Sequence, residues 1–473
     1  MFDPSSVEIL ETKFERANVN GLKPFQSGKI PEQYKGFYTE EEIATLLEGK
    51  VEERMKAKIS DHYRQLAMTS EPLKNLVKAR PEETFDLAGE ADPSNQLNYS
   101  PVPGLLHKYE LVLLYSSMTC SAHCRYCYRL DLFSGKTGKG LVKAHDAAEY
   151  IRNYNEKARA GEIVDNQGKQ RFPIREALLS GGDPMVLSNR KLFDYMSLLA
   201  DSGVRIIRIG TKELAFYPDR FDDNFFDMLD KFNEKFPRTH VAMMVHFTHP
   251  DEFLQKDENG EYIEEHNGRF QWIEQTGEAV RRLSGRDFVS MENQTPIIHQ
   301  VNDDADALRL MQKELRSRKI RNHYYFQCRE IEGHRAFAVP VEESWQIHND
   351  SQKGLSGIEK SRFAMSTEWG KMEVISMIDA ADIGALGKDL SPDARKLAEE
   401  LFGEGLIFFK IMRSPHGAST QGQLVIAKRN PNALWISGYE DRIIYDGREE
   451  GQARYKGLGG VFAKAFADSL EAA

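Results

Sequence analysis

The sequence predicts an α/β protein built around a partial parallel β/α barrel of six units, with a helical region before it and a further region after it. Short apolar runs recur between residues 111 and 328, and helix-compatible segments lie between them. Strands that alternate with helices form parallel β/α units. Six units are fewer than the eight that close a complete barrel.

The expected strands share a length of six to eleven residues and a high apolar content. They are residues 111–117, 175–182, 204–212, 240–249, 291–301 and 323–328. Helices are expected from the 3.6-residue spacing of apolar side chains in residues 189–203, 221–236, 276–285 and 305–318. Two polar, glycine-containing segments predict a surface loop at residues 156–171 and a hairpin-like insertion at residues 255–270.

Three regions are expected along the chain. Residues 1–104 form a helical N-terminal region, since apolar side chains recur at three- and four-residue steps in residues 38–67. Residues 105–345 form the barrel. Residues 346–473 form a C-terminal domain that we expect to pack over the barrel as a cap. In a barrel, the functional side chains lie at the carboxyl ends of the strands.

The composition indicates a globular chain. Of 473 residues, 40% are hydrophobic and 29% charged, which excludes a disordered or collagen-like protein. The net charge of −10 argues against nucleic acid as the main partner, because such binding depends on neutralising phosphates. No apolar run approaches the ~20 residues that span a bilayer, and the first residues lack the layout of a signal peptide. We therefore expect a cytoplasmic protein without a membrane partner.

The cysteines give the sharpest signal. The chain has four, and Cys120, Cys124 and Cys127 form a CxxxCxxC motif directly after the first expected strand. Iron–sulfur clusters are normally held by four thiolates, so three clustered thiolates leave one iron open to another ligand. A structural zinc site is the alternative, but it needs a fourth ligand. His123 does not fit that spacing, and Cys328 lies two hundred residues further on.

The CxxxCxxC motif, with Tyr126 before its third cysteine, resembles that of the radical S-adenosylmethionine (SAM) superfamily. The glycine-rich motif of residues 180–184, SGGDP, follows the second expected strand and is similar to the element that binds the amino group of SAM. The resemblance implies that Cys120, Cys124 and Cys127 hold a [4Fe–4S] cluster and that Tyr126 lies against the adenine. It also implies that Ser180, Gly181, Gly182 and Asp183 contact SAM, with glycine allowing close approach.

Further motifs resemble the lysine 2,3-aminomutase family. They are residues 124–129 (CRYCYR), 178–184 (LLSGGDP), 208–212 (RIGTK), 246–250 (HFTHP), 293–294 (NQ), 301–303 (VND) and 324–328 (YYFQC). The resemblance implies a partial (β/α)6 TIM-like barrel of the radical SAM type. It further implies an isomerase in which SAM and pyridoxal 5′-phosphate (PLP) move an amino group from Cα to Cβ of a small amino-acid-like substrate. A reductant such as flavodoxin or ferredoxin and a homo-oligomeric state are implied as well.

Individual roles follow from this resemblance. Arg129 matches the arginine that binds the substrate carboxylate, with a surface arginine as the alternative. Asp303 matches a carboxylate that holds the distal amine of lysine, with a solvated aspartate or a helix cap as the alternative. Lys371 matches the catalytic lysine that binds PLP, with a solvated lysine as the alternative.

The sequence departs from the family at four places. Residues 367–370 replace the glycines before the PLP lysine, and Arg329 stands where a second carboxylate is expected. A cation at 329 repels an ε-ammonium and pairs with a substrate acid or with Asp303. His107 and Lys108 are kept, but Glu110 and Leu111 stand where an arginine is expected, and no cysteines remain for a C-terminal zinc site.

Several functions therefore stay open. In one, PLP is bound through Lys371 and the substrate is a different, acidic amino acid. In another, PLP is lost and the enzyme uses SAM alone on a different small substrate. A binding protein with a zinc or iron–sulfur centre is a third possibility. A hydrolase is disfavoured because the sequence contains no GxSxG, HExxH or P-loop motif.

Overall fold

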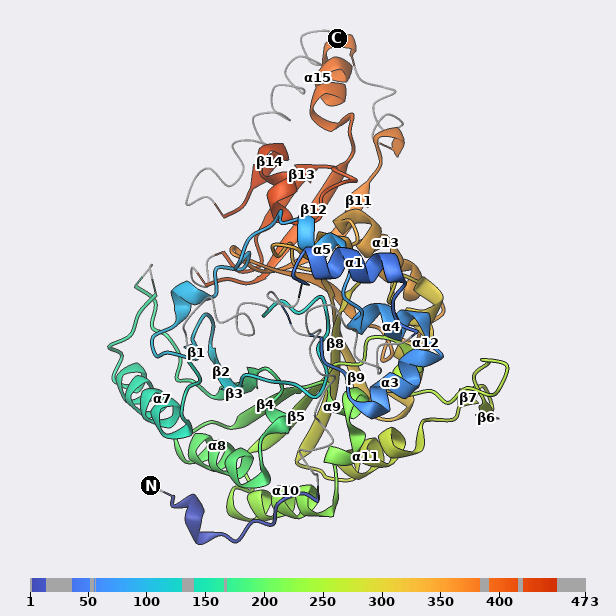
Figure 1. Ribbon diagram of the computed structural model, residues 1–473. Helices are drawn as coiled ribbons and strands as arrows, with labels where there is room; N and C mark the ends of the chain where they lie inside the picture. The colour runs from blue at the N-terminus through green and yellow to red at the C-terminus, as the bar shows by residue number, and fades with distance from the viewer. Residues whose placement is uncertain are drawn as a thin grey trace.

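The computed structural model describes residues 2–13, 36–51, 55, 57–129, 140–165, 168–382, 391–415 and 420–448. Within these residues, twelve strands join one sheet in the order β1-β2-β3-β4-β5-β8-β9-β10-β11-β12-β13-β14 (Figure 1). The strands are β1 (Leu105–Leu106), β2 (Leu111–Ser117), β3 (Glu176–Gly181), β4 (Ile206–Thr211), β5 (His240–Val245), β8 (Val289–Ile297), β9 (Ile320–Gln327), β10 (Arg362–Thr367), β11 (Gly370–Ile378), β12 (Leu406–Arg413), β13 (Leu424–Lys428) and β14 (Ile443–Asp446).

The central part of the sheet is parallel. Strands β2, β3, β4, β5, β8 and β9 pair in chain order, each parallel to the next. These are the six apolar runs expected from the sequence, so the α/β class and the parallel sheet are confirmed. Their carboxyl ends lie at one edge of the sheet, where β2 leads into the cysteine motif and β3 into the glycine motif.

Helices connect these strands and run along the outer side of the sheet (Figure 1). They are α7 (Ala144–Arg159), α8 (Asn189–Asp201), α10 (Asp223–Lys235), α11 (Glu274–Ser284), α12 (Ala305–Ser317) and α13 (Val341–Ser351). Three of them begin at a side-chain cap: the side chains of Ser188, Asp222 and Asp304 accept hydrogen bonds from backbone N–H groups in the first turn. Local sequence thus fixes where these helices start.

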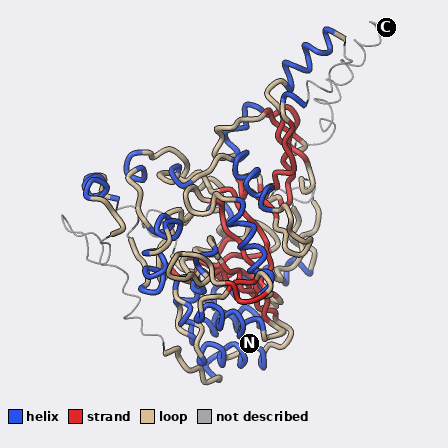
Figure 2. Tube along the Cα trace, turned by 90° about the vertical axis from the view of Figure 1, so that its right-hand side faces the viewer, coloured by secondary structure: helices blue, strands red, loops and turns tan. Residues whose placement is uncertain are grey.

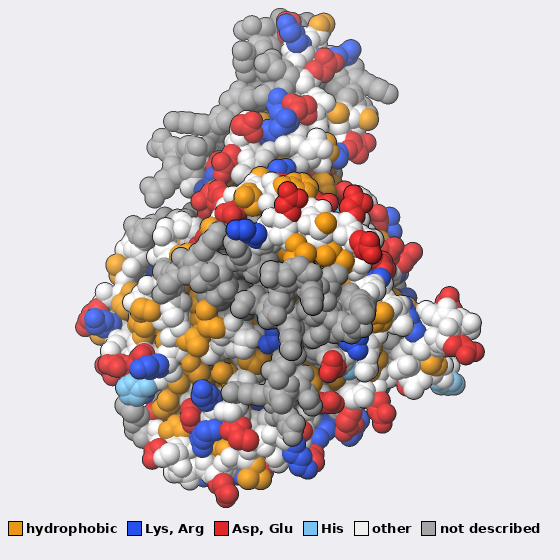
Figure 3. All heavy atoms as spheres, in the orientation of Figure 1, with side chains coloured by type: hydrophobic (Ala, Val, Ile, Leu, Met, Phe, Trp, Pro, Cys, Tyr) orange, Lys and Arg blue, Asp and Glu red, His pale blue; other side chains and the backbone are white. Residues whose placement is uncertain are grey.

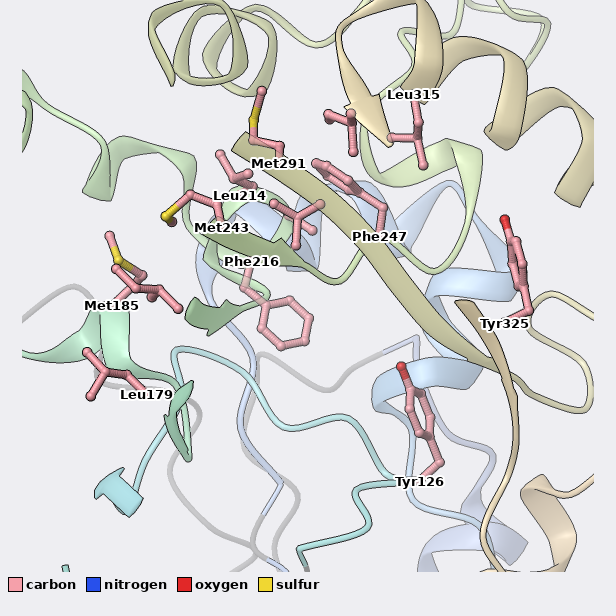
Figure 4. Close-up of a cluster of buried hydrophobic side chains, with 14 of the residues drawn as sticks. Tyr126, Leu179, Met185, Leu214, Phe216, Met243, Phe247, Met291, Leu315 and Tyr325 are labelled. Atoms are coloured by element: carbon pink, nitrogen blue, oxygen red, sulfur yellow. The ribbon is translucent and has the colours of Figure 1, made fainter. Parts of the chain in front are cut away.

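One continuous core joins the sheet to the helices. It includes Leu179 on β3, Met243 on β5 and Phe247 just beyond β5, all fully buried. Figure 4 shows Tyr126, from the cysteine motif, in the same close-up as these side chains. The cysteine motif is therefore anchored in the core by its aromatic residue.

The N-terminal helices α1 (Glu40–Glu48), α3 (Asp61–Met68), α4 (Glu71–Val77) and α5 (Glu82–Phe85) meet the carboxyl-end side of the sheet. The Tyr63 hydroxyl on α3 donates to Glu252 Oε1 at 2.8 Å, and the Ser60 hydroxyl donates to the Phe216 carbonyl. The helical character expected for this region holds for the residues described. Short helices are α9 (Glu213–Phe216), η1 (Pro4–Ser6), η4 (Leu97–Tyr99), η5 (Pro184–Val186), η6 (Pro218–Arg220), η7 (Pro250–Glu252), η8 (Arg335–Phe337) and η10 (Ile436–Arg442).

The C-terminal strands extend the same sheet. Strand β10 pairs parallel to β9, and β11 to β14 follow as antiparallel neighbours. The sheet continues upward out of the body together with α15 (Pro392–Phe402) (Figures 1 and 2). The boundary expected between residues 345 and 346 falls inside α13.

The two polar segments differ in structure. The expected hairpin is present as β6 (Glu264–His266) and β7 (Arg269–Phe270). The expected loop at 156–171 begins as the last turn of α7 and continues to a bridge between Val164 and Gln170.

In the described part of the chain, every helix is too short or too polar to cross a membrane. Acidic and basic side chains are intermingled on the face shown in Figure 3.

Candidate active site

The cysteine motif occupies the loop that leaves β2, and the N-terminal region clamps its backbone. The His123 N–H donates to the Lys58 carbonyl at 2.8 Å, and the Arg125 N–H donates to the Leu76 carbonyl at 2.9 Å. On the barrel side, the Ser121 N–H donates to Glu213 Oε1 at 3.0 Å. Because both sides hold the loop by its backbone, its three thiols are free to face a common cavity.

A buried ion pair fixes the middle of this loop. Arg125 is fully buried, and its guanidinium donates to Glu83 Oε2 at 2.6 Å and Oε1 at 3.2 Å. It also donates to the Met55 carbonyl at 2.7 Å. Burying a charge is costly unless it is paired and hydrogen-bonded, and both conditions are met here. The arginine between the second and third cysteines thus ties the loop to α5.

The glycine motif packs directly against the start of the cysteine loop. Gly181 has φ +116°, and a Cβ there would lie 2.3 Å from the Ser117 carbonyl oxygen. A Cβ on Gly182 would lie 2.3 Å from the Thr119 carbonyl oxygen. From the sequence we expected these glycines to make room for the amino group of SAM. In the structure, the space of the missing side chains is filled by the backbone of residues 117–119.

Asp183, next to the two glycines of the motif, is buried and hydrogen-bonded to the end of β4. Its carboxylate accepts hydrogen bonds from the Thr211 hydroxyl at 3.0 Å and from the Lys212 N–H at 2.7 Å. Burial raises the pKa of Asp183, and burial together with Asp183 raises the pKa of Glu213. Asp183 therefore joins the ends of β3 and β4 rather than projecting into solvent.

A cavity of about 140 Å³ lies between these two motifs. The lining residues come from six places in the chain and include Cys120, Cys124, Cys127, Tyr126, Ser180, Gly181, Gly182 and Asp183. The Tyr126 hydroxyl lies 3.1 Å from His246 Nε2 and 3.2 Å from the Thr248 hydroxyl. The structure thus brings together all the residues expected to bind the cluster and SAM.

The thiols fit a cluster better than a single ion. Among the described residues, no three histidine, cysteine or acidic side chains converge closely enough to hold one metal ion. A [4Fe–4S] cluster does not need that arrangement, because each cysteine binds a different iron. Burial raises the pKa of Cys124 to about 12, so loading iron must displace a proton. Cys328 is not among the residues that line this cavity.

Arg129 lies at the inner end of the same cavity. It is 4% exposed, which excludes the alternative of a surface arginine. One guanidinium nitrogen donates to the Ser180 hydroxyl at 2.5 Å and to the Gly181 carbonyl at 2.9 Å. The guanidinium also stacks on the rings of Tyr115 and Tyr128, at 5.1 and 4.8 Å from their centroids.

Lys371 is the second residue of strand β11, just after the tight turn that joins β11 to β10. Thr367 and Gly370 pair across this turn, and a Cβ on Gly370 would lie 2.1 Å from the Arg413 carbonyl oxygen. The Lys371 ammonium lies 4.1 Å from the centroid of the Tyr324 ring. Burial and the neighbouring cation Arg413 lower the pKa of Lys371 to about 7. Lys371 is therefore a half-buried amine with a lowered pKa and not a fully solvated lysine.

Three cavities lie next to one another along the sheet. The second, about 170 Å³, shares the lining residues Tyr128 and Gln294 with the cysteine-lined cavity. The third, about 270 Å³, shares Arg208, Lys371 and Arg413 with the second. Together they reach the size of small-molecule sites, roughly 300–1,000 Å³. Lys371 thus lines a cavity that borders the cysteine-lined cavity.

Of the remaining two predicted residues, Arg329 lines one of these cavities and Asp303 does not. Arg329 lines the second cavity, and its guanidinium lies 4.2 Å from the Tyr128 centroid. Asp303 lines none of these three cavities. Its carboxylate instead lies 2.9 Å from His299 Nδ1 and accepts from the Gln300 N–H at 3.0 Å. The cap of α12 is Asp304, so the helix-cap alternative for Asp303 is also not realised.

Sequence reasoning missed four charged residues of the site. Lys212 forms a buried ion pair with Glu252 at 2.6 Å and borders the cysteine-lined cavity. The role of Lys212 could have been predicted from the sequence, since Lys212 is the last residue of the RIGTK motif. Arg208 and Arg413 line the lysine-containing cavities. Nothing in the local sequence marks Arg413, which comes from β12.

Three thiols beside a glycine motif, at the carboxyl edge of a parallel sheet, define the class: an α/β protein built to hold a cluster with one open iron. No family model matches the chain. Two Aquifex aeolicus proteins, each named "Putative L-lysine 2,3-aminomutase", are similar to it. One is 28% identical over 402 residues, covering 83% of this chain and 90% of that protein. The other is 30% identical over 297 residues, covering 62% and 68%.

A more distant relative is the glutamate 2,3-aminomutase of Clostridioides difficile. It is 23% identical over 280 residues, which cover 59% of this chain and 56% of that protein. The chain belongs to the lysine 2,3-aminomutase family, a branch of the radical SAM enzymes. The resemblance stated from the sequence motifs is confirmed.

Proposed function

We propose that this protein is a radical SAM aminomutase that uses PLP to move an amino group between neighbouring carbons of an amino acid. The observation that carries the proposal is the wall that two cavities share. Tyr128 and Gln294 border both the space lined by the three cysteines and the space lined by Lys371. A radical formed in one space would therefore lie next to a substrate held in the other.

Cys120, Cys124 and Cys127 would hold a [4Fe–4S] cluster with one iron left for SAM. Tyr126 would lie against the adenine, with its hydroxyl oriented by His246 and Thr248. Ser180, Gly181, Gly182 and Asp183 would form the wall next to SAM. When bound, the cluster and SAM supply a carbon radical for hydrogen abstraction, and PLP supplies the electron sink for nitrogen transfer.

Lys371 would hold PLP. Two properties of the site support this role. The residue is half-buried, and a pKa of about 7 would make its amine largely neutral, and thus nucleophilic, slightly above neutral pH. The cavity around it also carries the cations Lys108, Arg329 and Arg413, which suit a phosphate group.

Arg129 would bind the carboxylate of the amino acid through a two-pronged contact. The hydrogen bonds that it donates to the Ser180 hydroxyl and the Gly181 carbonyl hold the guanidinium in the wall of the cysteine-lined cavity. The substrate's Cα would then lie between the SAM side and the Lys371 side of the site.

We further infer that strands β2 to β9 curve into a partial (β/α)6 barrel. Glu176 on β3, Ala242 on β5 and Tyr324 on β9 line one cavity, although β3 and β9 are separated by three strands in the sheet. A flat sheet would not bring these side chains around a common space. A flavodoxin- or ferredoxin-type reductant, a cytoplasmic location and a homo-oligomer complete the proposal by resemblance.

Anaerobic reconstitution with iron, sulfide, SAM and PLP tests the proposal. We expect an iron–sulfur absorption band, release of 5′-deoxyadenosine after reduction, and PLP fixed to Lys371 by borohydride, located by peptide mass spectrometry. Lys371→Ala should lose the fixed PLP but keep the iron. Lys353→Ala, which changes a lysine with a 71% exposed side chain, is the matched control and should keep both.

Two results would contradict the proposal. Bound iron without any 5′-deoxyadenosine would argue against a radical SAM enzyme. Normal release of 5′-deoxyadenosine without PLP on Lys371 would favour a PLP-independent radical SAM enzyme that acts on a different substrate.

A further inference from the structure

We propose that the substrate is an amino acid with a carboxylate in its side chain, and that Arg329 binds this distal carboxylate. The inference rests on the proposed function, since it concerns the cavity in which Lys371 would hold PLP. It assigns to this chain a substrate class and a residue that selects it. The positive charge of the residues that line this cavity supports the inference.

The cavity that contains Lys371 has a strongly positive wall. Five cationic side chains line it, and no aspartate or glutamate is among its lining residues. The cations are Lys108, Arg208, Arg329, Lys371 and Arg413. Like charges gathered in a partly enclosed space repel one another and are stable only with anions between them. The charge of the lining residues therefore favours the binding of an anionic ligand.

Most of these cations lack a carboxylate partner in the described structure. Arg208 is paired with Glu176 at 2.7 Å. Arg329 and Arg413 have no carboxylate within the 4.0 Å of an ion pair, and Lys108 donates to the backbone carbonyls of Ser94 and Thr367 instead. Two acids act on these cations from outside the cavity lining: Asp92 on Lys108 and Arg329, and Glu368 on Lys108. The guanidinium groups of Arg329 and Arg413 are thus left to pair with ligands.

PLP does not balance them all. A phosphate monoester carries about −1.5 to −2 charges at pH 7. A phosphate held by Lys108 and Arg413 would leave the Arg329 guanidinium without an anion. The α-carboxylate of the substrate is assigned to Arg129, which does not line this cavity. The remaining positive charge fits a second carboxylate on the same amino acid.

Arg329 is the cation best placed for this second carboxylate. It stacks at 4.2 Å on one ring, Tyr128, on which Arg129 also stacks at 4.8 Å. Both guanidinium groups therefore contact Tyr128, the residue that lines both cavities. An amino acid with two carboxylates can be held by one guanidinium at each end.

A substrate with a distal ammonium does not fit this wall. It would meet the Arg329 guanidinium without a facing carboxylate, because no acid lines the cavity. Asp303, which the family resemblance assigns to a distal amine, instead contacts His299 and the Gln300 N–H. The cation at Arg329 and the position of Asp303 both favour a substrate with a distal carboxylate over lysine.

Binding of amino acids to the reconstituted, PLP-loaded protein tests the inference without turnover. The change in the PLP absorption spectrum gives a Kd for L-glutamate, L-aspartate, L-lysine, and the uncharged isosteres L-glutamine and L-asparagine. We expect at least one dicarboxylate to bind about tenfold to a hundredfold tighter than its amide, since a hydrogen-bonded charge pair contributes that much. Arg329→Gln should remove this preference, and Arg329→Lys should restore part of it. Arg281→Gln, which changes an arginine with a 72% exposed side chain, should leave it unchanged.

The outcomes separate the two proposals. If wild-type protein takes up no PLP, the proposed function fails and the inference fails with it. If PLP is bound but acids and amides bind equally, or L-lysine binds best, the inference alone is wrong. If Arg329→Gln takes up no PLP, Arg329 binds the phosphate and the inference is again wrong.

Discussion

A Cβ added to Gly182 would lie 2.3 Å from the carbonyl oxygen of Thr119. The glycine motif that ends β3 and the cysteine loop that leaves β2 are therefore in backbone contact. The Asp183 N–H donates to this same Thr119 carbonyl at 2.8 Å, so the two loops are also hydrogen-bonded. The position of the first cysteine depends directly on the absence of a side chain on the neighbouring strand.

Gly182→Ala should displace the start of the cysteine loop. The clash is with backbone, which cannot rotate away, and overpacking of this kind costs about 1–3 kcal/mol. We expect lower iron content after reconstitution, measured against protein concentration, in a chain that still folds by circular dichroism. Gly357→Ala is the control, because a Cβ at Gly357 meets no atom within 4 Å. Full iron loading in Gly182→Ala would show that this contact does not position the thiols.

Breaking the ion pair between Arg125 and Glu83 should destabilise the protein strongly. Removing one partner of a buried pair leaves the other charge uncompensated, at a cost of about 3–5 kcal/mol. Arg125→Met should therefore lower the urea midpoint and reduce iron loading together. The exposed pair of Arg281 and Glu278 offers a comparison, and Arg281→Met should have little effect. A urea midpoint equal to that of wild type would contradict the role of the buried pair.

Lys371 should react as an amine at unusually low pH. Its pKa of about 7 means that half of the side chains are neutral near neutrality, whereas an ordinary lysine reaches that point near pH 10.4. Competitive acylation followed by mass spectrometry should give a midpoint near pH 7 for Lys371 and a much higher one for the exposed Lys353. Arg413→Gln removes a neighbouring positive charge, so it should raise the pKa of Lys371 and move the midpoint upward. A midpoint near pH 10 in wild type would show that the amine is solvated.

The ring of Tyr126 should matter more for SAM than its hydroxyl. Stacking of an aromatic ring on a base contributes about 1–3 kcal/mol, whereas a net hydrogen bond contributes about 1 kcal/mol. We expect Tyr126→Phe to weaken SAM binding only a few-fold and Tyr126→Ala to weaken it tenfold or more, by equilibrium dialysis on the iron-loaded protein. Equal losses in both variants would assign the effect to the hydroxyl contacts with His246 and Thr248 instead.

Much of the candidate site could be predicted from the sequence, because the motifs that form it are short and local. Cys120, Cys124 and Cys127 fall within one loop, and the residues of the SGGDP motif follow the next strand, so adjacent parallel strands must place them side by side. The six strands could also be predicted, because strands of a parallel sheet covered by helices are continuous apolar runs. Lys371 was found through a family position rather than through any physical signal in its neighbours.

The rest was decided by contacts between residues far apart in the chain. The family resemblance implied that Asp303 holds the substrate's distal amine, whereas in the structure its carboxylate contacts His299 and the Gln300 N–H. Arg413 enters the lysine cavity from β12, and its proximity lowers the pKa of Lys371. The sequence by itself determined the parallel sheet and the three-thiol motif, since periodicity and spacing are properties of neighbouring residues. Only the tertiary structure decided the charge of the cavity, because electrostatic energy depends on distance in space and on burial, which neighbouring residues in the chain do not set.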